Sequence, residues 1–358
     1  MPIFDQGYQR WSGTLSGHAW RWLAITRRGV RVGLTNRLLR VVMLVAWMPA
    51  IALALVLCLW GLIEQKSELV APLAQMLPFL VPEILSDPRA YRVEIWTLCF
   101  SYFMWIELYF SMVVILLVGP NLISQDLRYN ALPLYFSRPL RRIDYFLGKL
   151  GVIAAFLAMV IVVPSLTAYV LGLLFSLDLS IVRDTFGLLL ASIAYGLVIT
   201  LSAGLLVLAL SSLSRNSRYI ALFWLAIWFV SSVVAATLDS ANQQQQRHQA
   251  WQASHQRPGA NFGGVDYVQA EIDAAKTNWR PLVSYTANLS RVGQEMLGTD
   301  ASWEKLSQLA PPSQRAQFLF VYMGPQYPWY WSAAVLIGLF GLSACILKWS
   351  IKSLDRLK

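Results

Sequence analysis

Six apolar runs of membrane-spanning length constrain this chain more than any other feature of its sequence. A helix needs about 20 apolar residues to cross roughly 30 Å of hydrocarbon, and each run reaches that length. The runs cover residues 41–63, 98–123, 146–175, 185–213, 219–238 and 329–349. Because 57% of the residues are hydrophobic and only 13% are charged, little sequence is left for a large water-soluble domain. The sequence therefore predicts an all-α polytopic membrane protein with six transmembrane helices.

The lysines and arginines predict how these helices are oriented. If both termini are cytoplasmic, the cytoplasmic segments hold eighteen basic residues and the opposite segments hold eleven, seven of them in the long stretch 239–328. Long translocated stretches contribute little to orientation, so the short connections decide it. We expect a multi-pass protein of the cell (inner) membrane with both termini in the cytoplasm. The net charge of +10 lies mostly beside helix ends, where anionic membrane lipid rather than nucleic acid explains it.

The first forty residues predict an amphipathic helical segment at the cytoplasmic membrane surface. Tryptophans at positions 20 and 22 are mixed with several arginines, which suits aromatic rings at headgroup depth and guanidinium groups beside phosphate. Gly29 and Gly33 are expected to divide the segment into two pieces. The alternative is a solvated basic tail, which would leave the tryptophans in water.

The stretch 239–328, between the fifth and sixth apolar runs, differs in character from the rest of the chain. It is polar, carries scattered charge, and contains glutamines at every position from 243 to 246. Residues 250–275 and 299–320 have helical character and are separated by prolines and glycines. We expect a small, mainly helical extracytoplasmic domain here. Residues 41–238 then hold helices 1–5, and residues 329–358 hold helix 6 and a cytoplasmic tail.

Residues 124–137, between the second and third runs, predict a short projecting helix on the cytoplasmic side. Ser124 can cap such a helix, and Pro133 ends it. The Asp126 carboxylate lies in its first turn, where the helix dipole stabilises a negative charge. The projection offers apolar side chains, namely Leu127, Ala131, Leu134 and Tyr135, beside charged neighbours. A rigid projection of this kind suits docking into a groove of a partner protein. The alternative is an ordinary loop that lies on the lipid headgroups.

This segment resembles the ABC-2-type permeases, the membrane subunits of a large class of ATP-driven exporters. The positions that carry the resemblance are Asp126, Ala131, Leu132, Ser137, Arg138, Pro139, Arg142, Tyr145, Gly148 and Lys149. Asp126 stands where glutamate is commoner in the family, and Asn130 stands where glycine is commoner. The six-helix topology, the basic segment before the first span and the insertion between helices 5 and 6 are similar as well. The resemblance implies the type V exporter-like permease fold.

The resemblance also implies how the chain works and what it associates with. The segment 124–137 would be the coupling helix, and the residues that contact the partner ATPase would be Asp126, Leu127, Arg128, Asn130, Ala131, Leu134 and Tyr135. The expected partners are two nucleotide-binding subunits and a second permease copy, as a homodimer or a related heterodimer. The chain contains no GxxxxGK[ST] phosphate-binding sequence. ATP, Mg²⁺ and hydrolysis are therefore expected on the partner subunit, with no cofactor, metal or catalytic residue on this chain.

Three side chains at membrane depth are candidates for a cavity or a gate. Glu107 lies near the middle of the second run, where an ionisable group costs at least about 2.5 kcal/mol and marks a functional site by default. Its alternative is a structural tie to a neighbouring hydroxyl. Trp224 and Trp228, with Phe229 beside them on the fifth run, could form an aromatic cavity wall, although aromatic core packing is the favoured interpretation.

Three functions are compatible with these features. The first is the permease subunit of an exporter. The second is a mechanical transmitter that passes ATP-driven motion to an extracytoplasmic partner without moving a substrate. The third, a membrane enzyme or sensor, is disfavoured because the sequence contains no catalytic constellation.

Overall fold

The computed structural model describes residues 20–65, 86–132, 141–176, 180–256, 276–311 and 327–355, together with the single residues 84, 135, 315, 318 and 319. Within these residues, six helices are long and apolar enough to cross a membrane. They span Arg37–Glu64, Pro88–Arg128, Ile143–Phe175, Ser180–Leu213, Ser217–Gln245 and Trp329–Ser350. Each predicted run lies within one of them, so the prediction of six spans is confirmed.

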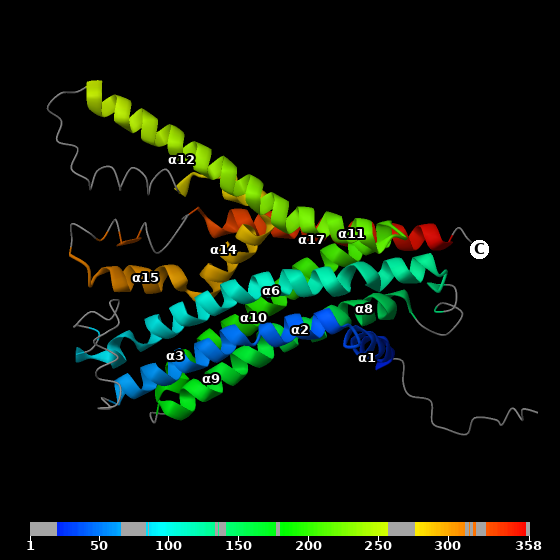
Figure 1. Cartoon of the computed structure of the whole chain (residues 1–358), viewed down its shortest axis with the longest axis horizontal. Coiled ribbons are helices and arrows are strands. Elements are labelled where there is room, and N and C mark those ends of the chain that lie inside the picture. The colour runs from blue at the N-terminus through cyan, green and yellow to red at the C-terminus, as the bar shows by residue number, and fades with distance from the viewer. Residues whose placement is uncertain are drawn as a thin grey trace, which may run out of the picture.

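Several spans consist of more than one helical element (Figure 1). The spans are built, in chain order, from α2 (Arg37–Val45) and α3 (Met48–Glu64); η2 (Pro88–Tyr91) and α6 (Arg92–Arg128); α8 (Arg142–Leu157), the π-helical η3 (Ala158–Val162) and α9 (Val163–Phe175); α10 (Ser180–Leu213); α11 (Ser217–Leu225), the π-helical η4 (Ala226–Val230) and α12 (Ser231–Gln256); and α17 (Trp329–Asp355). The helix α1 (Arg21–Gly33) lies at one end of the bundle, and α15 (Thr299–Ser307) lies at the opposite end. We call these the α1 end and the α15 end.

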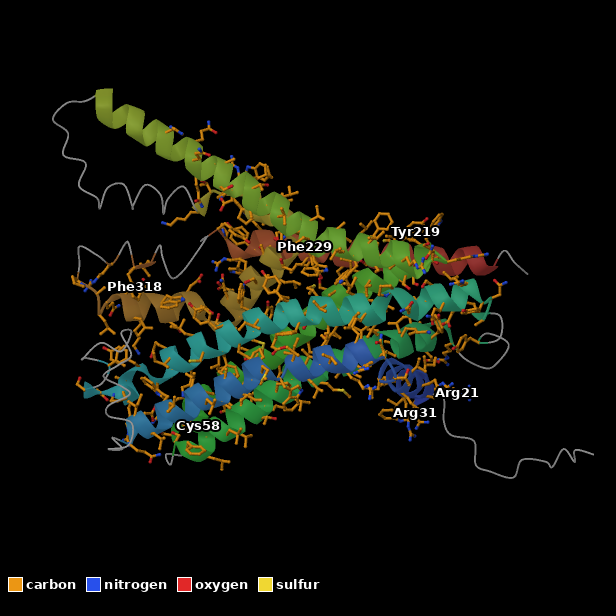
Figure 2. The ribbon with its side chains drawn as sticks, viewed as in Figure 1. Arg21, Arg31, Cys58, Tyr219, Phe229 and Phe318 are labelled. Carbon is orange, nitrogen blue, oxygen red and sulfur yellow. The ribbon has the colours of Figure 1, made fainter. Side chains whose placement is uncertain are left out.

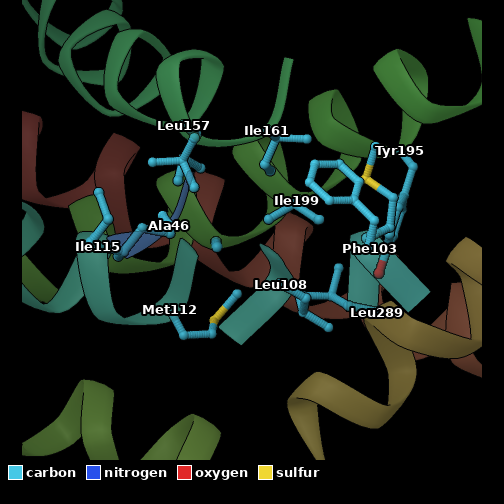
Figure 3. Packing of buried hydrophobic residues seen from close by; sticks show 14 of the residues in the cluster. Ala46, Phe103, Leu108, Met112, Ile115, Leu157, Ile161, Tyr195, Ile199 and Leu289 are labelled. Carbon is cyan, nitrogen blue, oxygen red and sulfur yellow. The ribbon is translucent and has the colours of Figure 1, made fainter. Parts of the chain in front are cut away.

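The helices α6 and α10 form the centre of the bundle, and they are the most buried of the six spans. Figure 3 shows side chains of α6, α8 and α10 meeting in this core, among them Met112, Leu157 and Ile199. The absence of a side chain at Gly119 of α6 lets Val207 of α10 approach closely. The fifth and sixth spans are largely exposed, which suits helices whose outer faces are covered by lipid tails or another membrane protein.

A serine of α10 hydrogen-bonds the backbone of α6 on both sides of the turn after Pro120. The Ser211 hydroxyl donates to the Pro120 carbonyl (3.1 Å) and accepts from the backbone N–H groups of Ile123 (3.1 Å) and Ser124 (3.0 Å). Because these hydrogen bonds support the turn after Pro120, α6 continues to Arg128. The prediction that Ser124 caps a separate short helix is therefore wrong. Ser124 lies inside α6, and its hydroxyl donates to the Pro120 carbonyl.

The described part of the amino-terminal segment is helical and breaks after Gly33, one of the two predicted positions, but not at Gly29. The chain leaves α1 at Gly33, and the Asn36 side chain then caps α2 by accepting from the Leu38 N–H group (3.0 Å). Gly29 lies inside α1 rather than at a break. A side chain at Gly29 would collide with Val152 of α8, so this glycine serves close packing.

Part of the stretch 239–328, which was predicted to form a small helical domain, packs against the spans. The helix α12 carries the fifth span onward to Gln256, and η5 (Arg280–Val283) and α14 (Tyr285–Leu297) return to the bundle. The Tyr285 hydroxyl hydrogen-bonds the Ser202 hydroxyl of α10 (2.9 Å), and the Tyr195 ring of α10 lies against Gly293. The reason is that α14 is amphipathic and buries Tyr285, Leu289 and Val292 in the bundle core. Most of the predicted helix 250–275 lies outside the described residues.

Candidate functional site

The α1 end of α6 finishes in a compact turn at Asn130. The backbone N–H of Ala131 bonds to the Asp126 carbonyl (2.9 Å), and that of Asn130 bonds to the Leu127 carbonyl (3.4 Å). This pair of bonds is the Schellman motif, which requires a left-handed residue and therefore favours glycine or asparagine. Asn130 has φ of 49°, which is the left-handed backbone that this motif requires.

Asp126 joins the end of α6 to the beginning of α8. Its Oδ2 atom accepts a hydrogen bond from the Tyr145 hydroxyl (2.7 Å) and lies 2.6 Å from Lys149 Nζ. The side chains of Asp126 and Lys149 are only 16% and 11% exposed, so water screens their attraction weakly. The ammonium group also lies 5.4 Å from the centre of the Tyr145 ring. These three groups, which we call the Asp126 cluster, fix both ends of the connecting segment to each other.

Tyr135 adds the connecting segment itself to this cluster. Its ring centre lies 5.4 Å from that of Tyr145. Burial raises the pKa of Tyr135, the Asp126 carboxylate raises it further, and Arg28 of α1 opposes the shift. Tyr135 therefore lies within electrostatic range of both the Asp126 cluster and α1.

The residues at the tip of α6 face outward. Tyr129 is 73% exposed, Arg128 and Asn130 are exposed beside it, and the Arg128 guanidinium lies 5.8 Å from the centre of the Tyr129 ring. Leu127 packs against the bundle core, and Ala131 is half-buried. Leu134 lies outside the described residues. The structure therefore divides the predicted contact residues into an exposed tip and a buried base.

The helix α1 packs against α8 beside the Asp126 cluster. The Thr26 hydroxyl donates to the Gly148 carbonyl (3.0 Å), and the lack of a side chain at Gly148 lets Ile25 and the Trp22 backbone approach closely. Figure 2 shows Arg21 and Arg31 on α1 at this end of the bundle, at its margin. α1 and the tip of α6 thus both lie at the α1 end, on elements that meet α8.

The three gate candidates lie apart from the coupling segment. Glu107 is fully buried in α6, and neither carboxyl oxygen has a hydrogen-bond partner among the described residues. Trp224 is also fully buried, and its indole N–H donates to the Met112 carbonyl (3.0 Å). Trp228 belongs to η4, and its buried indole N–H lacks a partner within the described chain. None of the three lines the cavity described below.

Sequence reasoning missed three residues of this site as contributors. Lys149 and Tyr145 supported the resemblance but were not expected to contact Asp126, and Tyr129 was not named. A signal for Lys149 exists, because a lysine near the start of an apolar span needs an acidic partner. Nothing in the spacing of 23 residues identifies Asp126 as that partner.

Comparison with known proteins agrees with this architecture. A family model described as "ABC-2 family transporter protein" matches residues 29–344, which is most of the chain. No curated protein matches it. The matched range includes the first five spans, most of the sixth, the Asp126 cluster, and α14 and α15. The chain therefore belongs to the ABC-2 family of transporter proteins, the membrane-embedded permease components of ABC transporters.

Proposed function

We propose that this permease receives ATP-driven motion at the tip of α6 and uses it to export a substrate across the cell membrane. ATP and Mg²⁺ bind to a separate nucleotide-binding subunit in this proposal. The family match supports a permease, and the exposed tip supports a docking role because Arg128 and Tyr129 project from a segment that is tied down on both sides. A push on this tip reaches α6 and α8 together through the Asp126 cluster.

The observation that carries the proposal is the ion pair between Asp126 and Lys149. An exposed loop on lipid headgroups would need no buried link between the two helices it joins. A buried pair instead makes the tip, α6 and α8 move as one unit, because separating two poorly solvated charges is costly.

Cysteine crosslinking to the co-expressed ATPase subunit tests the docking site. We expect Tyr129→Cys to crosslink to the partner, since Tyr129 is 73% exposed at the tip. Trp279→Cys is the matched control, because Trp279 is also an exposed aromatic residue (56%). It lies before η5, in the stretch 239–328 that is predicted to be extracytoplasmic, where the ATPase subunit cannot reach it. Both variants are made after the three native cysteines are replaced. Equal crosslinking at the two positions, or none at position 129, contradicts the proposal.

Membrane orientation and a second copy complete the proposed assembly. Both termini face the cytoplasm in this proposal, and alkaline phosphatase fused after Lys358 is expected to be inactive. Two copies assemble through membrane-embedded faces. The exposed apolar side chains of the fifth span, among them Leu222 and Phe223, support such a contact. Native mass spectrometry of the permease–ATPase complex measures the number of copies.

Mechanical transmission is the second candidate function, and the packing of α15 on α6 favours it. Lys305 Nζ of α15 lies 2.6 Å from Glu94 Oε1 and donates to the Ala90 carbonyl (3.0 Å). The Thr299 hydroxyl also hydrogen-bonds Ser101 of α6 (3.2 Å). One continuous helix therefore links the coupling tip to α15.

The two candidates differ in the consequence of loosening α15. Removing the whole stretch 239–328 would also remove α14 from the core, so a point change is the sharper test. Lys305→Met would uncouple an extracytoplasmic partner from ATP hydrolysis if the chain is a transmitter, and it would leave substrate-stimulated ATPase activity in liposomes unchanged if the chain is an exporter. A complex whose ATPase activity no substrate stimulates, and whose partner is uncoupled by Lys305→Met, would count against export as proposed.

A further inference from the structure

A mixed polar and aromatic cavity lies between α6, α12 and α14. Its volume is about 370 Å³, and it is bounded also by η5 and by Tyr327, just before α17. The coupling residues do not line it. The question is which kind of molecule its lining fits.

Three hydroxyl groups meet at this cavity. Ser232 Oγ of α12 lies 3.0 Å from Ser284 Oγ and 2.9 Å from Thr286 Oγ1, and the latter two are 3.2 Å apart. The π-helical η4 lies directly before Ser231 and Ser232, and both serines bond to the start of α14.

Ser232 Oγ also donates to the Trp228 carbonyl (2.5 Å), and Ser284 Oγ also accepts from the Ala287 N–H group (3.1 Å). Ser284 and Thr286 are each 3% exposed. Each hydroxyl oxygen has two acceptor positions, so the positions that remain can accept a hydrogen bond from a ligand.

The charged side chains of the lining are already engaged by the protein. Arg291 is 8% exposed and donates to the Tyr327 carbonyl (2.8 Å) and to Asp300 Oδ2 (2.7 Å). Asp239 accepts hydrogen bonds from the side-chain amides of Asn278 (2.5 Å) and Gln243 (3.2 Å). One acidic and one basic residue line the cavity, so its lining has no net charge. A ligand with a strong charge of its own would find no free counter-charge here.

The opposite wall is aromatic. Trp105 and Tyr109 of α6 are 51% and 37% exposed, and their ring centres lie 5.2 Å apart in an edge-to-face arrangement. An indole face offers a flat apolar surface, against which the C–H face of a ring-shaped polyol can pack while its hydroxyls reach polar groups. Phe229 and Val233 of the fifth span, three residues before the lining residues Ser232 and Ala236, are about half exposed, and Figure 2 shows Phe229 near the junction of α11 and α12. These side chains suit a hydrocarbon tail.

We propose that this cavity binds the uncharged, hydroxyl-rich headgroup of an amphiphile, with its hydrocarbon tail along the exposed face of the fifth span. The hydroxyl cluster and the engaged charges select an uncharged hydrogen-bonding head, and Trp105 packs against its ring. This assignment of a substrate class rests on the export function proposed above.

Binding of short-chain probes to the permease–ATPase complex in lipid nanodiscs tests the proposal. Hexyl maltoside carries the predicted headgroup, and hexylphosphocholine and hexyltrimethylammonium carry the same chain with a zwitterionic or cationic head. Isothermal titration calorimetry is expected to show saturable binding of hexyl maltoside alone. Trp105→Ala is expected to weaken that binding about tenfold, since stacking on an aromatic face contributes up to about that much. Trp349→Ala is the control, because Trp349 is an exposed tryptophan (71%) at the α1 end of α17.

Equal binding of the charged probes, or unchanged binding to the Trp105→Ala variant, overturns the assignment. Uptake of hexyl maltoside that never saturates also overturns the assignment, because it indicates partition into the lipid rather than binding to the protein. Crosslinking of Tyr129→Cys to the ATPase subunit is measured on the same preparations. Crosslinking without maltoside binding means that this assignment fails while the docking role stands, and absent crosslinking means that the proposed function itself fails.

Discussion

Lys149 Nζ lies 2.6 Å from Asp126 Oδ2, and this contact joins the last turn of α6 to the second turn of α8. Both side chains are almost excluded from solvent, and the Tyr145 hydroxyl completes the arrangement. Removing either charge leaves the other poorly solvated and without its counter-charge.

Asp126→Asn and Lys149→Met are each expected to lower the free energy of unfolding by about 1–3 kcal/mol, because a buried charged group loses its partner. The double variant is expected to lose less than the sum of the two changes, since it removes both charges. Denaturant titration in detergent measures all three. Additive losses would mean that the two groups do not interact. Both single variants are also expected to lower the coupling of ATP hydrolysis to transport.

Asn130→Gly is expected to leave stability unchanged or to raise it slightly, because φ of 49° suits glycine best. Asn130→Val is expected to cost about 1–2 kcal/mol relative to wild type, since a β-branched side chain disfavours the left-handed conformation. The neighbouring Tyr129 has φ of −93°, so Tyr129→Val is the matched control and should have little effect. Equal costs at the two positions would refute the assignment of this turn.

Gly148→Val is expected to displace α1 from α8. A Cβ atom at this position would lie 2.7 Å from Ile25 Cβ and 3.0 Å from the Trp22 carbonyl oxygen. Release of α1 exposes its arginines, so trypsin should cleave the variant in α1 faster than it cleaves wild type. Gly338→Val is the control, because a Cβ atom at position 338 would have no neighbour within 4 Å among the described residues. Matching cleavage rates for the two variants would show that α1 is not held by this contact.

Glu107→Leu is expected to raise the thermal midpoint of the purified protein. An unpartnered buried polar group costs about 1–3 kcal/mol, and leucine removes that cost. Glu107→Gln retains a buried polar group and serves as the control. If the carboxyl group takes part in transport, the leucine variant will be more stable and less active. A lower midpoint for Glu107→Leu would reveal a partner outside the described residues.

The spans could be predicted from sequence because each is a long apolar run, and length alone distinguishes such runs from loops. The left-handed backbone at Asn130 was not predicted, although asparagine is one of the few residues that adopt it readily. The end of α6 could not be predicted in the same way. Ser124 has the chemistry of a helix cap, yet Ser211 of α10 supports the turn before it, and that partner is 87 residues away.

The packing of the stretch 239–328 shows a second limit of prediction from sequence. Its polarity correctly distinguished it from a seventh span, but the apolar face of α14 is short and lies within a polar stretch. Its burial depends on contacts with Tyr195 and Ser202 of α10, which no local pattern encodes. The cavity lining was missed for the same reason, since Trp105, Ser232 and Arg291 come from separate segments.

The contact between Ser211 and Pro120 divides α6 into two unequal lengths, so a rotation of the helix about this contact would move its two ends by different distances. The length from Pro120 to the coupling tip is roughly 12 Å, and the length toward α15 is roughly 42 Å, at about 1.5 Å per residue. A rotation of α6 about this contact that moves the tip by about 1 Å would sweep the far end by roughly 3.5 Å. If an ATPase subunit docks at the tip as proposed, small strokes there would become larger displacements where Lys305 of α15 contacts Glu94.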